Sequence, residues 1–83
     1  MDDSTPSTAT DLSRTLVALR ERAGRGMAET SRALDLSRQT VWRWENGRRA
    51  PDYDQLRTLL DLYGATADER EAAERARRAA LAV

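Results

Sequence analysis

The chain has 83 residues, with 14 basic residues, all of them arginine, and 14 acidic residues, so its formal net charge at neutral pH is zero. This length corresponds to one small domain with a limited core. Cysteine and histidine are absent, which excludes disulfides, thiolate metal sites and the commonest general base of enzymes. No apolar run is long enough for a signal peptide or a membrane span, so we expect an intracellular protein without a metal or cofactor.

The N-terminal segment, residues 1–10, is rich in Ser, Thr and Asp and has no apolar periodicity, which predicts a disordered arm. The next segment repeats apolar residues at spacings of four, three and four, the pattern of a helix with one apolar face. These residues are Leu12, Leu16, Leu19 and Ala23. We therefore expect a first helix from residue 11 or 12 to residue 23, ended by Gly24.

Two short helices separated by a tight turn are expected within residues 27–49. Residues 27–34 contain neither Gly nor Pro, and residues 35–37 interrupt them. Ser37 is a good N-cap, because its hydroxyl can accept a hydrogen bond from a free amide of the next turn. The second helix, residues 38–46, ends at Gly47, where a left-handed conformation is least costly. Two helices across such a turn are typical of a helix-turn-helix, the supersecondary unit that reads DNA.

The second of these helices has two different faces. At about 100° per residue, Val41 and Trp44 fall on one side, which we expect to pack on the rest of the domain. Glu45, the only acid in this helix, falls towards the same side. The outer side carries residue types that form bidentate hydrogen bonds with base edges: Arg38, Gln39, Arg43 and Asn46. This pattern predicts that the helix reads the major groove of double-stranded DNA.

Residues 34–51, LDLSRQTVWRWENGRRAP, closely resemble the phage-repressor-like (Xre-type) helix-turn-helix family. The resemblance extends from about residue 16 to residue 64. It implies an all-α fold, a compact lambda-repressor-like bundle of about five helices that acts as a homodimer on a near-palindromic operator. It places Arg38, Gln39 and Arg43 at base-reading positions. It also places Arg20 and Glu45 at the positions of an ion pair between the first and third helices.

A second set of residues is predicted to contact the DNA backbone. The resemblance places Thr40, Asn46 and Arg49 at positions that commonly meet phosphate. Arg48 and Arg49 form a basic loop directly behind the reading helix, which favours contact with the sugar-phosphate backbone. Met27 and Trp42 complete the predicted phosphate-contacting set.

Met27 and Trp42 are less clear members of this set. Met27 stands where the family usually has a glutamine that touches DNA, although the free amides at this helix start could hold a phosphate. Two interpretations of Trp42 stay open: contact with a sugar or a thymine methyl group, or packing on the next helix near Tyr53. Asp35 replaces the glycine of the turn in the family, and Asp tolerates the left-handed conformation better than most residues.

A fourth helix is expected after Pro51, with Asp52 and Gln55 forming a capping box. Its apolar stripe is Leu56, Leu59, Leu60 and Tyr63, followed by Gly64. Residues 11–64 are thus the predicted DNA-binding domain.

The C-terminal segment, residues 65–83, is rich in Ala, Arg and Glu and begins with a capping box of Thr66 and Glu69. Its small residues form a stripe that would let another helix approach closely: Ala72, Ala76, Ala79, Ala80 and Val83. Three interpretations stay open: packing on the first helix of the same chain, dimerisation or another protein partner, or a connection to a further domain.

Positive charge is concentrated around the motif, since residues 11–50 contain nine arginines and five acids. The sequence therefore predicts a sequence-specific, double-stranded DNA-binding regulator of transcription, a cytoplasmic repressor or autoregulator that contacts no membrane. The alternative is an antitoxin-like or other protein-interaction module whose DNA binding is secondary. We do not expect an enzyme. The sequence has no histidine, no cysteine, no glycine-rich phosphate loop and no set of metal ligands.

Overall fold

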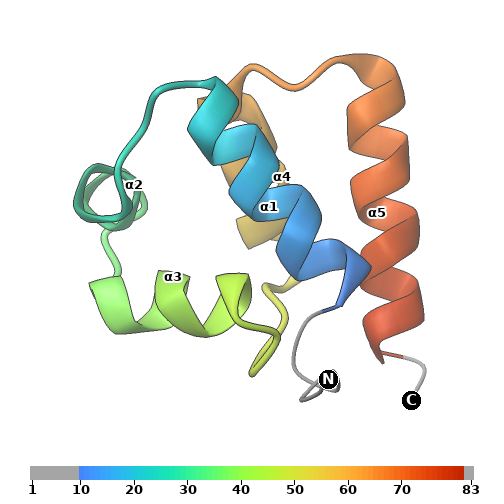
Figure 1. Cartoon of the computed structure of the whole chain (residues 1–83), viewed down its shortest axis with the longest axis horizontal. Helices are drawn as coiled ribbons and strands as arrows, with labels where there is room; N and C mark the ends of the chain where they lie inside the picture. Colours follow the sequence, from blue (N-terminus) through green and yellow to red (C-terminus); the bar gives the residue numbers. More distant parts are fainter. Residues whose placement is uncertain (1–9, 82–83) are drawn as a thin grey trace, which may run out of the picture.

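The computed structural model describes residues 10–81, so most of the predicted arm, residues 1–9, and Val83 of the predicted small-residue stripe lie outside it. Within this range the chain is entirely helical apart from its connections (Figure 1). The helices are α1 (Asp11–Arg22), α2 (Met27–Ala33), α3 (Arg38–Glu45), α4 (Tyr53–Tyr63) and α5 (Ala67–Leu81). The predicted all-α bundle of five helices is confirmed.

Three helices begin at the caps that the sequence predicts. The hydroxyl of Ser37 accepts from the amide of Thr40 at 3.2 Å. Asp52 accepts from the amide of Gln55 at 2.7 Å, and the Gln55 side chain accepts from the Asp52 amide at 2.9 Å. The same reciprocal pair joins Thr66 and Glu69 at the start of α5. Each cap satisfies amides that the first helical turn leaves without a partner.

The start of α1 corrects the predicted boundary of the arm. Thr10 belongs to the folded domain, because its hydroxyl accepts from the amide of Ser13 at 3.0 Å and the Ser13 hydroxyl accepts from the Thr10 amide at 2.9 Å. The Ser- and Thr-rich composition of residues 1–10 made this capping box hard to recognise. Its N3 residue is Ser13, where a capping box usually has Glu or Gln.

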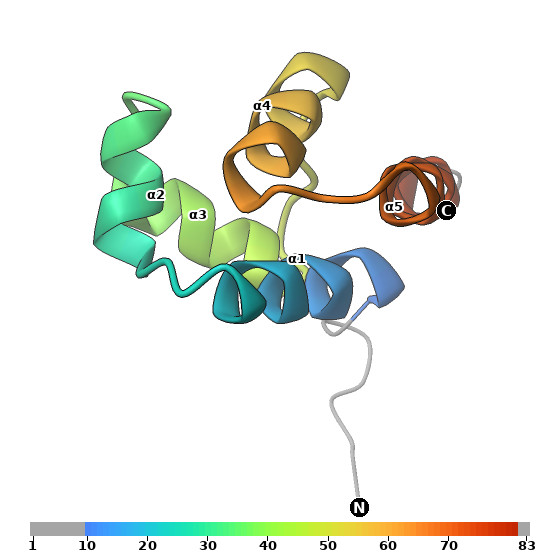
Figure 2. The same cartoon turned by 90° about the horizontal axis from the view of Figure 1, so that it is seen from above.

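The core is formed mainly by the apolar stripes of α1 and α4, together with the inner face of α3. The residues predicted for these stripes are buried, apart from Ala23, which is partly buried. The core residues are Leu12, Leu16, Leu19, Val41, Trp44, Leu56, Leu59, Leu60, Tyr63, Ala65 and Ala73. Helix α2 packs on α3 at one end of this core, and α5 closes the other end (Figure 2).

Helix α5 packs on α1 and α4 of the same chain, as one of the three interpretations expected. The predicted contact stripe was wrong in part, since Ala73 is fully buried whereas Ala72 and Ala79 are exposed. Short side chains of similar size give little contrast between helix faces, so the sequence pattern did not fix the rotation of α5. An ion pair between Arg22 and Glu69 joins α1 to the first turn of α5.

Candidate nucleic-acid interface

Helices α2 and α3 and the turn between them lie at one edge of the bundle (Figure 1). Asp35 adopts the left-handed conformation, with φ of 58°, and lets the chain reverse direction. The turn is tied to α2, because the amide of Leu36 donates to the carbonyl oxygen of Ser31 at 2.8 Å. Val41 and Trp44 are 1% and 2% exposed, so the inner face of α3 is anchored in the core and its outer face is left to solvent.

An ion pair fixes the end of α3 to α1. Nε of Arg20 lies 2.7 Å from Oε2 of Glu45, and a second guanidinium nitrogen lies 3.0 Å from Oε1. The remaining guanidinium nitrogen donates to the carbonyl oxygen of Arg25 at 2.9 Å, which ties the loop before α2 to the same group. The pKa of Arg20 is raised above its usual value, mainly by the hydrogen bond to Glu45, although burial opposes this rise.

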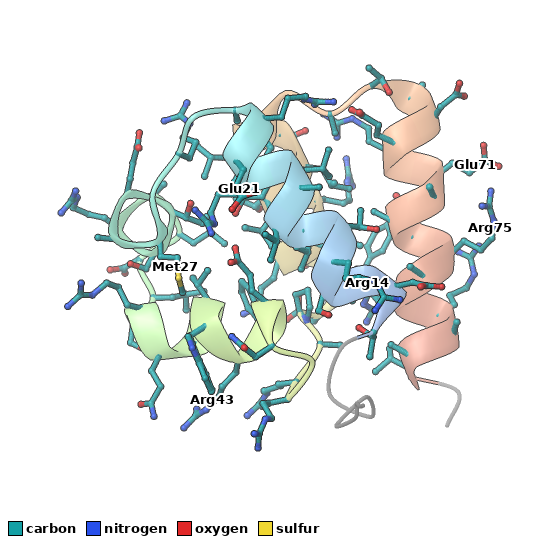
Figure 3. The ribbon with its side chains drawn as sticks, viewed as in Figure 1. Arg14, Glu21, Met27, Arg43, Glu71 and Arg75 are labelled. Atoms are coloured by element: carbon teal, nitrogen blue, oxygen red, sulfur yellow. The ribbon has the colours of Figure 1, made fainter. Side chains whose placement is uncertain are left out.

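The outer face of α3 carries polar groups that have no partner within the described part of the chain. Arg38 and Gln39 are exposed, and Figure 3 shows Arg43 projecting from α3 away from the other helices. Elsewhere in residues 10–81, six arginines form ion pairs with acids. None of these pairs uses an arginine of α3 or of the loop that follows it. Within residues 10–81, positive charge on this face is therefore not neutralised by an ion pair.

Two hollows flank α3 and contain the residues predicted to contact DNA, except Asn46 and Arg48. A hollow of about 510 Å³ is bordered by Thr40, Arg43 and Arg49, with Asp52, Gln55 and Arg77 on its far rim. On the side of α2, a shallow hollow of about 550 Å³ brings together other members of the predicted set, with two small residues: Gly26, Met27, Ala28, Arg38, Gln39 and Trp42. Seven of the residues predicted to contact DNA thus border two separate hollows on the surface around α3, and not one cavity.

Three residues predicted to contact the DNA backbone also contact or border other parts of the protein. The Thr40 hydroxyl lies 3.0 Å from the Ser37 hydroxyl, so it is oriented by the N-cap. The side-chain amide nitrogen of Asn46 donates to the carbonyl oxygen of Trp42 at 2.8 Å. Arg48 is exposed beside a smaller hollow of about 180 Å³ that α5 also borders. Asn46 and Arg48 therefore lie at the C-terminal margin of the surface.

The comparisons with known proteins agree with this geometry. Residues 11–73 match the family model described as a helix-turn-helix domain. The chain belongs to this family. Its function is that of a DNA-binding regulator of transcription. No curated protein matches the chain.

A solved structure similar to this helix-turn-helix protein is that of the clp gene regulator ClgR from C. glutamicum. Its TM-score is 0.69 and its sequence is 21% identical, with 92% of this chain and 99% of that chain covered. At this identity the likeness establishes the shared fold alone. Within the part of the chain that is described, no helix has the length and apolarity needed to cross a membrane.

The position of Trp42 in this helix-turn-helix corrects one interpretation from the sequence. Trp42 borders the hollow beside Met27, together with other residues of α2 and of the loop before it, and the main helix neighbours of α3 are α2 and α1. Tyr53 of α4 instead has the guanidinium of Arg57 above its ring, 5.7 Å from the centroid. Packing of Trp42 near Tyr53 is therefore not found, because residue 42 lies on the side of α3 that faces α2.

Sequence reasoning missed one residue near the interface. Arg77 of α5 borders the same hollow as Arg43, and its Nε donates to the carbonyl oxygen of Pro51 at 2.8 Å. The contact spans 26 positions in the sequence, and no local pattern connects them. Arg77 thus holds the end of the basic loop behind α3 in place.

Proposed function

We propose that this protein is a sequence-specific transcriptional repressor or autoregulator that inserts α3 into the major groove of double-stranded DNA. The observation that carries the proposal is the outer face of α3, where Arg38, Gln39 and Arg43 extend from a helix whose opposite face is anchored in the core. An arginine pairs bidentately with guanine and a glutamine with adenine, so this face carries donors and acceptors suited to base edges. Because Arg38 and Arg43 form no ion pair in the described part of the chain, DNA binding would break no ion pair there.

Phosphate contacts hold the helix in register with the groove. We assign this role to Met27, Thr40, Trp42, Asn46, Arg48 and Arg49. All of them except Asn46 border the hollows next to α3, and Asn46 is the C-cap of that helix. Met27 contributes through the backbone amide at the start of α2, since its side chain is apolar. Arg48 and Arg49 contribute charge, so their contacts should weaken as salt is raised.

We further propose that two copies of the chain bind a near-palindromic operator. An eight-residue helix is about 12 Å long, which matches one major-groove crossing and reads only a few base pairs. Two such helices on half-sites about 34 Å apart would double the sequence that is read. A regulator of this kind works where the DNA lies, which in bacteria is the cytoplasm. The proposal assigns the protein no catalytic step.

The direct test is selection from a pool of random duplexes by the full chain, without any partner, at a fixed salt concentration. We expect enrichment of a motif with two-fold symmetry and half-sites one helical turn apart. Enrichment of no motif, with binding that depends on salt alone, would contradict sequence-specific regulation. It would favour a protein-interaction module whose DNA binding is secondary.

Two substitutions then separate base reading from phosphate contact. Arg43→Ala should lose about 1–3 kcal/mol on the selected operator and little on random DNA, because it removes a bidentate base contact. Arg49→Ala should weaken both duplexes alike and reduce the dependence of affinity on salt. Arg78→Ala, on the exposed side of α5, is the matched control and should change neither. Identical behaviour of the Arg43 and Arg49 variants would refute the base-reading assignment.

A further inference from the structure

The hollow between α2 and α3 combines apolar and base-reading groups in one place. The Met27 and Trp42 side chains border it beside Arg38 and Gln39. Trp42 is 45% exposed, although it stands on the face of α3 that is otherwise polar. Figure 3 places Met27 between α2 and α3, and its side chain is partly buried against the core. The exposed indole ring and the partly buried thioether therefore form a small apolar surface beside the residues predicted to read bases.

A protein partner is a poor occupant for this hollow. A stable protein interface buries about 800 Å² on each partner, far more than two apolar side chains offer. The rim carries arginine and glutamine without an acid, and Arg38 forms no ion pair within residues 10–81. The hollow is also continuous with the face of α3 that we propose enters the major groove. Both the small apolar area and the positive rim fit DNA better than a protein.

The major groove offers one apolar group to such a surface, the C5 methyl group of thymine. The other groups on its floor are hydrogen-bond donors and acceptors, which an indole ring and a thioether would leave unsatisfied. Cytosine lacks this methyl group, and guanine and adenine present N7 at the corresponding edge. An apolar hollow at this position thus discriminates between pyrimidines by contact instead of hydrogen bonding.

We propose that Met27 and Trp42 form a subsite for a thymine methyl group, next to the base pairs read by Arg38 and Gln39. This inference rests on the proposed function and adds one base preference to each half-site. Met27 is then a specificity-determining residue through its side chain, in addition to the phosphate contact of its backbone amide. Arg38 and Gln39 hold the flanking bases, which fixes the methyl group over the indole ring.

The test removes one methyl group from the DNA. Each thymine of the selected operator is replaced in turn by deoxyuridine, which lacks only the C5 methyl, and the Kd of the full chain is measured by fluorescence anisotropy at fixed salt. We expect about fourfold weaker binding at one thymine of each half-site, which corresponds to ~0.8 kcal/mol for one buried methyl group. If no replacement changes the Kd by twofold, the subsite does not exist.

Protein variants connect this effect to the hollow. Trp42→Ala should bind the thymine and deoxyuridine operators equally at that position, and Met27→Gln should do the same while keeping a side chain of similar length. Tyr53→Ala removes an aromatic ring of similar exposure, 47%, on α4 and should keep the fourfold preference. Circular dichroism checks that each variant is folded. If Trp42→Ala does not fold, Met27→Gln serves as the test.

The outcomes separate the subsite from the function on which it rests. If the wild-type chain selects a motif but both variants still prefer thymine at that position, the subsite is refuted and base reading by α3 stands. A loss of affinity by the same factor for both operators, with the fourfold preference kept, would also refute the subsite, since it would leave only the phosphate contacts assigned to these two residues. If the wild-type chain selects no motif, the proposed function fails and the subsite fails with it.

Discussion

Removal of one partner of the Arg20–Glu45 ion pair should destabilise the whole domain. The two side chains are 15% and 6% exposed, so Glu45→Ala leaves a guanidinium with two unsatisfied donors in a nearly dry site. Breaking a buried pair in this way typically costs ~3–5 kcal/mol. Arg20 keeps its hydrogen bond to Arg25 and some access to water, so we expect a value near the lower limit, about 3 kcal/mol.

Thermal unfolding followed by circular dichroism measures this effect. For a domain of this size each kcal/mol lowers Tm by about 4–8 °C, so Glu45→Ala should lower it by roughly 12–24 °C. Glu71→Ala breaks an exposed pair with Arg75 on the outer side of α5 and should cost less than about 0.5 kcal/mol (Figure 3). Replacing both buried partners, Arg20→Met with Glu45→Leu, should recover most of the loss. A Tm within 2 °C of wild type for Glu45→Ala, roughly half a kcal/mol or less, would show that the reasoning is wrong.

Three further predictions concern local features of the fold. Asp35→Gly should raise the free energy of unfolding by about 0.5–1 kcal/mol, because glycine adopts the left-handed conformation without strain, whereas Asp35→Val should lower it in the same urea titration. Asp52→Ala should lower it by about 1 kcal/mol through loss of the α4 cap, and an unchanged urea midpoint would contradict this. The Arg22 guanidinium holds the pKa of Glu69 at about 2, below its usual value of 4.5, so the stability it adds is present above pH 4.5 and lost as the pH falls towards 2. Glu69→Gln should therefore be less stable than wild type at pH 6 and equal to it near pH 2.

Much of the fold could be predicted because local chemistry determines it. Ser37, Asp52 and Thr66 start helices by accepting hydrogen bonds from amides one turn ahead, and this requires only nearby residues. Gly47 and Gly64 end helices in the left-handed conformation, with φ of 69° and 66°. The ion pair of α1 with α3 came from the family resemblance, since no local pattern links positions 25 residues apart.

The parts that could not be predicted depend on packing between distant segments. The rotation of α5 places Ala73 in the core between α1 and α4, and neighbouring alanines of the same size give little contrast by which to predict it. The contact of Arg77 with Pro51 exists only once α5 has docked. The surroundings of Trp42 could not be predicted for the same reason, because its side chain could have packed near α2 or near α4. Residue types indicated the base-reading face, but only the structure divided it into two hollows.

The concentration of positive charge in residues 11–50, which contain nine arginines and five acids, has a consequence for the encounter with DNA. A molecule of zero net charge experiences no overall attraction to a polyanion at long range. The excess of arginine over acids around α3 nevertheless gives the molecule an uneven distribution of charge. If α3 reads DNA as we propose, the field of the duplex would exert a torque on this distribution within roughly a Debye length, about 8–10 Å, and would turn α3 inward before contact. Orientation thus precedes recognition, and the back of the protein has little tendency to adhere to nucleic acid.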